Sequence, residues 1–97
     1  MYRPLPNYLT IKESRIEGLG LFTTEYIEQG MEIGVSHYLI DDELIRTPLG
    51  GFYNHSLTPN CFTKVDKKRV VLTTCRDIEE GEELTVFYTM APLEEID

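Results

Sequence analysis

The sequence is short and strongly acidic, and these two properties exclude several classes of protein. Its 97 residues allow one domain and no second hydrophobic core. The formal net charge of −8 repels nucleic-acid phosphates, so we expect no direct nucleic-acid binding and a preference for a basic protein or peptide partner. The alternative is that the excess acid only keeps a small protein soluble.

The sequence carries no signal for a membrane. No apolar run approaches the roughly 20 residues that a spanning helix needs, and the N-terminus lacks a basic segment followed by an apolar one. We therefore expect no membrane contact. The protein should be soluble and intracellular, whether cytoplasmic, nuclear or, for a viral or bacterial protein, in a host cell.

The first third of the chain predicts an extended arm, a strand and a glycine turn. Residues 1–7 carry two prolines, and residues 8–12 have the aromatic and β-branched composition of a strand. Gly18 and Gly20 mark a place where the backbone needs positive φ or approaches another group closely, although a hairpin turn uses the same pattern. No third glycine follows at the spacing that a dinucleotide-binding fingerprint needs, and the next residues are strand-like, so that fingerprint is excluded.

A long strand is predicted over residues 32–40, where the pattern of side chains alternates. Strict alternation places four residues on one face: Ile33, Val35, His37 and Leu39. We expect His37 to be a hydrogen-bonded core histidine. Tyr38, on the opposite face, could be a core tyrosine or could point into a site.

The middle of the chain predicts turns and a structured loop. Residues 41–46 are expected to form one short helical turn, and residues 48–51 a tight connection. The stretch 52–61 then joins an aromatic pair to polar residues, a proline and an asparagine, which is a poor pattern for a strand or an amphipathic helix. Turn chemistry alone could explain this stretch, and ligand contact is the alternative.

The last third predicts short strands and turns. A hairpin, an acidic turn, a final strand and an acidic tail follow one another at residues 62–75, 76–83, 84–88 and 89–97. Within the hairpin, residues 62–65 and 69–75 are the strands. The predicted class is therefore mostly β, in a single domain over residues 1–97.

The two cysteines are too few for a disulfide framework. Without an export signal, Cys61 and Cys75 are expected to be reduced thiols on neighbouring strands. A zinc site that combined them with His37 and His55 would lack paired metal-ligand spacing, so we predict no bound metal.

Three blocks of residues occur in the order of a known family. The blocks are Gly18, Leu19 and Gly20; then Asn54, His55 and Ser56 with Pro59, Asn60 and Cys61; then Gly81, Glu82, Glu83, Leu84 and Thr85 leading to Tyr88. In this order, over residues 14–88, the chain resembles the SET domain, a family of S-adenosylmethionine-dependent protein lysine methyltransferases. The resemblance implies a small SET-type β-clip fold. In that fold the C-terminal strand passes under the segment 54–55 in a pseudoknot, an exception to the rule that chains avoid threading.

The resemblance also implies S-adenosylmethionine as the methyl donor. Gly18, Leu19 and Gly20 would approach the donor through backbone atoms. Asn54 and His55 match the pair that holds the amino group and the adenine of the donor, largely through main-chain contacts.

The catalytic and channel residues follow from the same resemblance. Tyr88 matches the tyrosine beside the transferred methyl group, and Tyr38 lies where many members carry a second active-site tyrosine. Candidate apolar walls of the substrate channel are Phe52, Val86 and Phe87.

The implied reaction moves a methyl group to the side-chain amine of a lysine in a basic protein, for which a histone is a candidate. Such an in-line displacement needs alignment more than a nucleophilic side chain. Tyr88 would orient the amine and is not assigned as a general base, because a phenol with a pKa near 10 is rarely ionised. Glu82 and Glu83 face opposite ways on a strand, so we interpret them as turn or surface carboxylates.

The chain departs from the family pattern in three ways. The segment between Tyr38 and Asn54 is short, the zinc-binding cysteines that often follow the catalytic tyrosine are missing, and Val86 replaces an aromatic residue that influences how many methyl groups are added. This minimal SET domain therefore leaves alternatives: a catalytically inactive SET-like module that binds basic peptides, or a structural β-domain. A homodimer, in which a second copy completes the peptide groove, is a further expectation.

Overall fold

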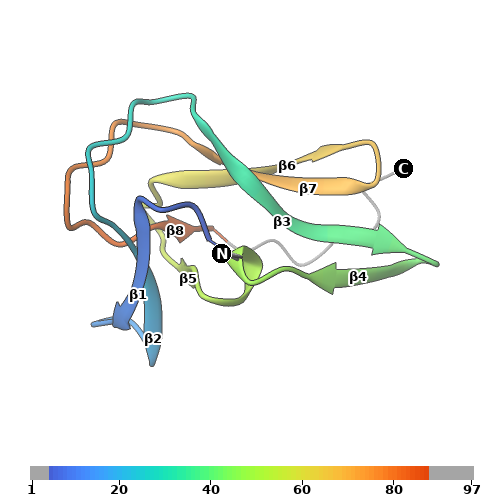
Figure 1. The fold of residues 1–97 in the computed structure, drawn as a ribbon, viewed down its shortest axis with the longest axis horizontal. Coiled ribbons are helices and arrows are strands. Elements are labelled where there is room, and N and C mark those ends of the chain that lie inside the picture. Colours follow the sequence, from blue (N-terminus) through green and yellow to red (C-terminus); the bar gives the residue numbers. More distant parts are fainter. Residues whose placement is uncertain (1–4, 88–97) are drawn as a thin grey trace.

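The computed structural model describes residues 5–87, which form two β-sheets and one short 3₁₀ helix (Figure 1). Strands β1 (Leu9–Glu13) and β2 (Leu19–Thr23) pair as a two-stranded antiparallel sheet. The larger sheet has six strands in the order β4-β3-β7-β6-β8-β5. Its strands and the helix are β3 (Glu32–Ile40), β4 (Glu43–Arg46), η1 (Leu49–Gly51), β5 (Asn54–His55), β6 (Cys61–Asp66), β7 (Arg69–Thr74) and β8 (Thr85–Val86). The predicted mostly β class is confirmed.

One hydrophobic core joins the two sheets. Its buried side chains come from both sheets, from helix η1 and from the turns around Ile27 and Ile78. Isolated bridges pair Phe22 with Glu83 and Ile27 with Ile78, so the segment before β8 is fastened to β2 and to the turn that follows it. Each fully buried side chain of this size contributes about 1.5–3 kcal/mol, which a domain this small needs.

The faces of β3 differ from the alternating prediction. Val35 pairs with Val71, whereas His37 pairs with the neighbouring Val70. Paired residues point to the same side of a sheet and successive residues to opposite sides, so Val35 and His37 lie on opposite faces. The prediction that they share a face is wrong because β3 carries register irregularities, and such bulges reverse the alternation.

His37 is half-buried, and its Nδ1 lies 3.0 Å from the Ser36 Oγ. It is therefore hydrogen-bonded, as expected. Burial first, and then the charge of Arg46, lower the pKa of His37 below its ordinary value near 6.5. Because the unfolded chain binds the proton more readily, stability from this group is present above that value and is lost as the pH falls.

Residues 41–46 form a hairpin and not the predicted helical turn. Asp41 and Asp42 have φ of 49° and 65°, and the flanking Ile40 and Glu43 pair directly across the antiparallel strands β3 and β4. Positive φ at both central residues is the requirement of the two-residue type I′ turn. The hairpin is the more stable conformation, because nucleating a single helical turn is unfavourable whereas the hairpin is stabilised by cross-strand side-chain pairs.

The hairpin of β6 and β7 is confirmed, and it holds the cysteines near each other. Cys61 begins β6 opposite Thr74, and Cys75 follows the end of β7. Both are free thiols, as predicted, with Cys61 buried and Cys75 exposed. Burial raises the pKa of the Cys61 thiol to about 12, with a smaller contribution from Cys75.

Strand β8 lies between β5 and β6 and is parallel to both. The connection from β5 to β6, residues 56–60, must therefore cross β8. A parallel crossover usually takes a dozen or more residues; five suffice here because β5 and β8 are only two residues long. This crossing matches the predicted SET-type fold, in which the C-terminal strand meets the segment 54–55.

Some predicted elements lie outside the described residues. Tyr88 and the tail at 89–97 belong to these, as do the first four residues of the predicted N-terminal arm. Within residues 5–87, no helix has the length and apolar character to span a membrane.

Candidate active site

The parallel pair of β5 and β8 brings together residues about thirty positions apart in the sequence. Asn54 is opposite Thr85 and His55 is opposite Val86, and the Ser56 N–H donates to the Val86 carbonyl at 3.1 Å. The sequence gives only the order of these motif blocks along the chain. In the structure, the Asn-His-Ser block lies directly beside the end of the Glu-Glu-Leu-Thr block.

The glycine block lies at the end of the β1–β2 loop and the start of β2. Gly18 has a φ of +49°, and its carbonyl accepts from the Ser14 N–H at 2.8 Å, which closes the loop. Nothing lies within 4 Å of where a Gly18 side chain would begin. Gly18 is therefore required for its backbone conformation and leaves open space beside the loop.

Asn54 connects β5 to this loop through its side-chain amide. The Nδ2 atom lies 3.2 Å from the Glu17 carbonyl and 3.4 Å from the Leu19 carbonyl. It also lies 3.1 Å from the Ser14 Oγ. The predicted glycine and asparagine residues therefore meet in one place.

Glu83 joins the same group, and sequence reasoning missed it. Its carboxylate accepts from the Asn54 Nδ2 at 2.7 Å and from the Ser14 Oγ at 2.8 and 2.9 Å. Interpreting Glu83 as a turn or surface carboxylate was wrong, because this half-buried group accepts hydrogen bonds from two distant parts of the chain. No local sequence pattern indicated this contact: Gly20 leaves room for a neighbour, but its burial and the identity of that neighbour are seen only in the structure.

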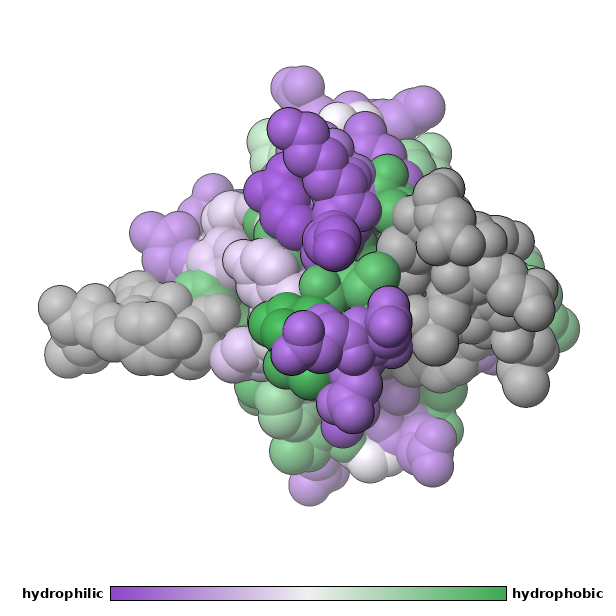
Figure 2. Space-filling model, turned by 90° about the vertical axis from the view of Figure 1, so that its right-hand side faces the viewer, coloured by the Kyte–Doolittle hydropathy of each residue, from purple (hydrophilic) through white to green (hydrophobic). Residues whose placement is uncertain are grey.

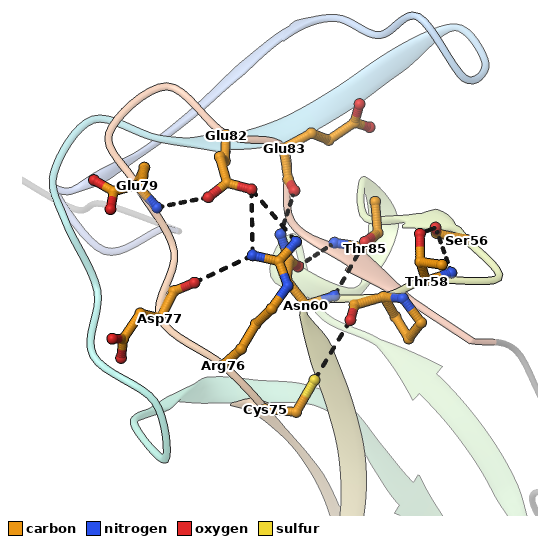
Figure 3. Close-up of polar contacts among 11 residues, drawn as sticks. Ser56, Thr58, Asn60, Cys75, Arg76, Asp77, Glu79, Glu82, Glu83 and Thr85 are labelled. Carbon is orange, nitrogen blue, oxygen red and sulfur yellow. Dashed lines mark hydrogen bonds and ion pairs between the residues drawn. The ribbon is translucent and has the colours of Figure 1, made fainter.

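Glu82 behaves as predicted for a turn carboxylate. Its Oε1 accepts from the Glu79 N–H at 2.7 Å, and its Oε2 lies 3.4 Å from the Arg76 guanidinium. Figure 3 shows the Glu82 and Glu83 side chains leaving the chain in different directions, Glu82 towards Arg76.

Aromatic rings border the region near β5. The His55 and Phe87 rings are 5.0 Å apart between centroids and tilted by 49°. Phe87 is half exposed, whereas Val86 is 3% exposed and belongs to the core, and Phe52 packs against that core. His55, predicted to contact the methyl donor, thus lies against Phe87, predicted to line the substrate channel. Val86 belongs to the core and does not reach the surface of this region.

Tyr38 lies in β3, which the strands β7, β6 and β8 separate from β5 in the sheet order. It pairs with Ile45 and Arg69 and is 42% exposed, with Ile40 and Ile45 also exposed nearby. Figure 2 faces this end of the molecule and shows apolar residues between hydrophilic groups. The active-site roles of Tyr38 and Tyr88 stay predictions.

Metal binding has no candidate among residues 5–87. No group of three or more His, Cys, Asp or Glu side chains is placed there to hold an ion.

The fold and this constellation agree with comparisons to known families. The sequence model of the SET domain matches residues 34–89. The chain therefore belongs to the SET-domain family, as the three motif blocks indicated.

Curated relatives are named histone-lysine N-methyltransferases. An H3 lysine-4 specific enzyme of Aspergillus oryzae is 43% identical over 74 residues, which is 66% of this chain and 6% of that protein. The trithorax enzyme of Drosophila virilis is 30% identical over 116 residues, covering 84% of this chain and 3% of the relative. The chain thus spans a small part of the length of these relatives.

Solved structures share the fold. A Plasmodium falciparum crystal structure, assigned to the histone methyltransferases, gives a TM-score of 0.75 at 22% identity, covering 90% of this chain and 97% of that one. A chain of Chaetomium thermophilum PRC2, in an autoinhibited conformation bound to S-adenosylmethionine, gives 0.69 at 22% identity, covering 82% and 15%. At this identity the likeness concerns the fold alone.

Proposed function

We propose that this chain transfers a methyl group from S-adenosylmethionine to the side-chain amine of a lysine in a basic protein, with a histone as the first candidate. The proposal rests mainly on the parallel pairing of β5 with β8 beside the loop of residues 14–19, which contains Gly18 and is called the glycine loop. It gathers the three motif blocks of a SET domain into one region. The names of the relatives support lysine as the acceptor.

The residues of this region fit an amphipathic donor. Gly18 leaves open space beside a backbone of positive φ, where a side chain would otherwise stand. Leu19 and Phe87 are each 51% exposed and offer apolar surface for a purine or a hydrocarbon chain. The backbone of Asn54 and His55 is proposed to supply the polar contacts to the donor. When bound, the donor supplies an electrophilic methyl group on a sulfonium.

The protein's own task is alignment and desolvation. A lysine amine has an ordinary pKa near 10.4, so at pH 7 its neutral form costs roughly 4–5 kcal/mol. An apolar channel lowers that cost by penalising the ammonium. Phe52 and Phe87 are the proposed wall residues, with Val86 holding the wall in place from the core.

Tyr88 is proposed to orient the acceptor amine through its hydroxyl. It follows Val86 by two residues, and Val86 is fixed beside His55. Tyr38 is proposed as a second active-site tyrosine. Neither needs to be ionised, because holding the amine and the methyl group in line supplies the rate enhancement.

Methyl transfer from labelled donor tests the proposal. The 97-residue chain is expected to label histones, and Tyr88→Phe is expected to lower the rate at least about tenfold without changing the thermal transition. Mass spectrometry of the product would locate the methyl group on a lysine. Absence of labelling on histones and on a broad protein extract contradicts the proposal, and labelling of a residue other than lysine contradicts the acceptor.

A further inference from the structure

The backbone around Glu83 is held from two sides. Phe22 and Glu83 form an isolated antiparallel bridge, and the Leu84 N–H donates to the Leu21 carbonyl at 2.7 Å. On the other side, the Asn60 Nδ2 donates to the Glu83 carbonyl at 2.8 Å (Figure 3). The direction of the Glu83 side chain is therefore set by its backbone.

That side chain gathers groups from two other parts of the chain. Ser14, at the start of the β1–β2 loop, and Asn54, in β5, both donate to its carboxylate. The Ser14 Oγ in turn accepts from the Ile16 N–H at 2.9 Å and holds the first turn of the loop. The carboxylate thus fastens residues 14–19 to β5.

Gly20 makes this arrangement sterically possible. A Cβ atom at position 20 would overlap the Glu83 carboxylate, 2.8 Å from its Cδ, and would lie 3.0 Å from the Ser14 Cβ. The Glu83 carboxylate thus occupies the space that a side chain at position 20 would need. The second glycine of the motif therefore serves Glu83, whereas Gly18 serves the backbone of the loop.

We propose that Glu83 is a positioning residue for the methyl donor: its carboxylate holds the glycine loop and Asn54 together in the arrangement that binds the donor. This inference rests on the proposed function. Glu83 would act through Ser14 and Asn54 and would touch neither the transferred methyl group nor the acceptor amine.

A carboxylate suits this position because both side-chain partners can donate a hydrogen bond to it. The Asn54 amide donates to one oxygen, and the Ser14 hydroxyl lies within hydrogen-bond distance of both. Hydrogen bonds to a charged acceptor are also the stronger kind. Glu83→Gln keeps the size of the side chain and removes the charge that strengthens these hydrogen bonds.

The test compares donor binding and turnover in Glu83→Gln and Glu82→Gln. The two variants remove the same charge from adjacent residues, but the partners of the Glu82 carboxylate are the Arg76 guanidinium and the Glu79 N–H, at exposed residues of the turn. Glu83→Gln is expected to raise the Kd for S-adenosylmethionine about tenfold, the size expected when a charge-assisted hydrogen bond is lost. Its kcat at saturating donor should stay within about twofold of wild type, and Glu82→Gln should change neither quantity by more than about twofold.

The possible outcomes distinguish a failure of the proposed methyl-transfer function from a failure of the positioning role of Glu83. Wild-type protein that binds no donor contradicts the proposed function and the role of Glu83 with it. Wild-type binding with unchanged Kd in Glu83→Gln, or a lowered kcat at saturating donor with unchanged Kd, overturns the positioning role alone. If Glu83→Gln fails to fold, Ser14→Ala replaces it, with an expected rise in Kd of about threefold, and an unchanged Kd in that variant overturns the inference.

Discussion

Asn60 is the residue on which the placement of β8 depends most directly. The residue is 2% exposed, and its side-chain amide bridges two backbone groups, donating to the Glu83 carbonyl and accepting from the Thr85 N–H at 2.9 Å. Its own N–H lies 3.3 Å from the Thr85 Oγ1. The Asn60 side chain thus provides hydrogen-bond partners for two backbone groups of the segment that leads into β8, the Glu83 carbonyl and the Thr85 N–H.

Replacing Asn60 by alanine is expected to lower the free energy of unfolding by about 2–4 kcal/mol, because two buried backbone groups lose their partner. Chemical denaturation measures this loss. Thr58→Ala, at an exposed position in the same connection, is the control and should cost less than about 0.5 kcal/mol. A loss below about 1 kcal/mol for Asn60→Ala would mean that the crossing is held by other contacts.

The two thiols should differ in reactivity. The thiolate is the reactive form, and with a pKa of about 12 Cys61 is ionised in about one molecule in 10⁴ at pH 8. Its side chain is also fully buried, whereas Cys75 is exposed. Iodoacetamide at pH 8 is expected to alkylate the native protein once, at Cys75, and the denatured protein twice, as measured by mass spectrometry. Rapid labelling of native Cys61 would contradict its burial.

At the scale of elements, the strands were predictable from the sequence, while their turns and faces were not. The alternation at residues 32–40 and the β-branched run after residue 69 mark β3 and β7 closely. The bulges in β3 leave no composition signal, so the face of His37 could not be obtained. The Asp41-Asp42 turn was not predicted, because aspartate is compatible both with the start of a helix and with the left-handed conformation of a hairpin turn.

Substitutions near the Asp41-Asp42 turn distinguish the hairpin seen in the structure from the helical turn predicted over residues 41–46. Asp42→Gly is expected to raise the free energy of unfolding by about 0.5–1 kcal/mol, because glycine adopts positive φ without steric cost. Glu43→Gly, in strand β4, is expected to lower it by a similar amount. Equal destabilisation by both substitutions, in chemical denaturation, would favour the helical turn that the structure replaces.

At the scale of the whole molecule, the crossing of β8 between β5 and β6 brings motifs that are far apart in the sequence into one region, which is the proposed site. Gly18, Asn54 and the segment before Tyr88 could be named from the sequence only because their order resembles a family. Glu83 and Ser14 could not, since hydrogen bonds between residues 69 positions apart leave no local pattern. The acidic composition, by contrast, predicted a basic partner directly from charge.

The most direct test of the account is calorimetric titration of S-adenosylmethionine into the 97-residue chain and into Asn54→Ala. Wild type is expected to bind one donor per chain. Asn54→Ala is expected to bind at least about tenfold more weakly, because the glycine loop loses its anchor on β5. Folding of both proteins, checked by circular dichroism, makes the comparison valid. No heat of binding in folded wild type, or equal affinity in Asn54→Ala, would contradict the assignment of the donor site to the region where the glycine loop meets β5 and β8.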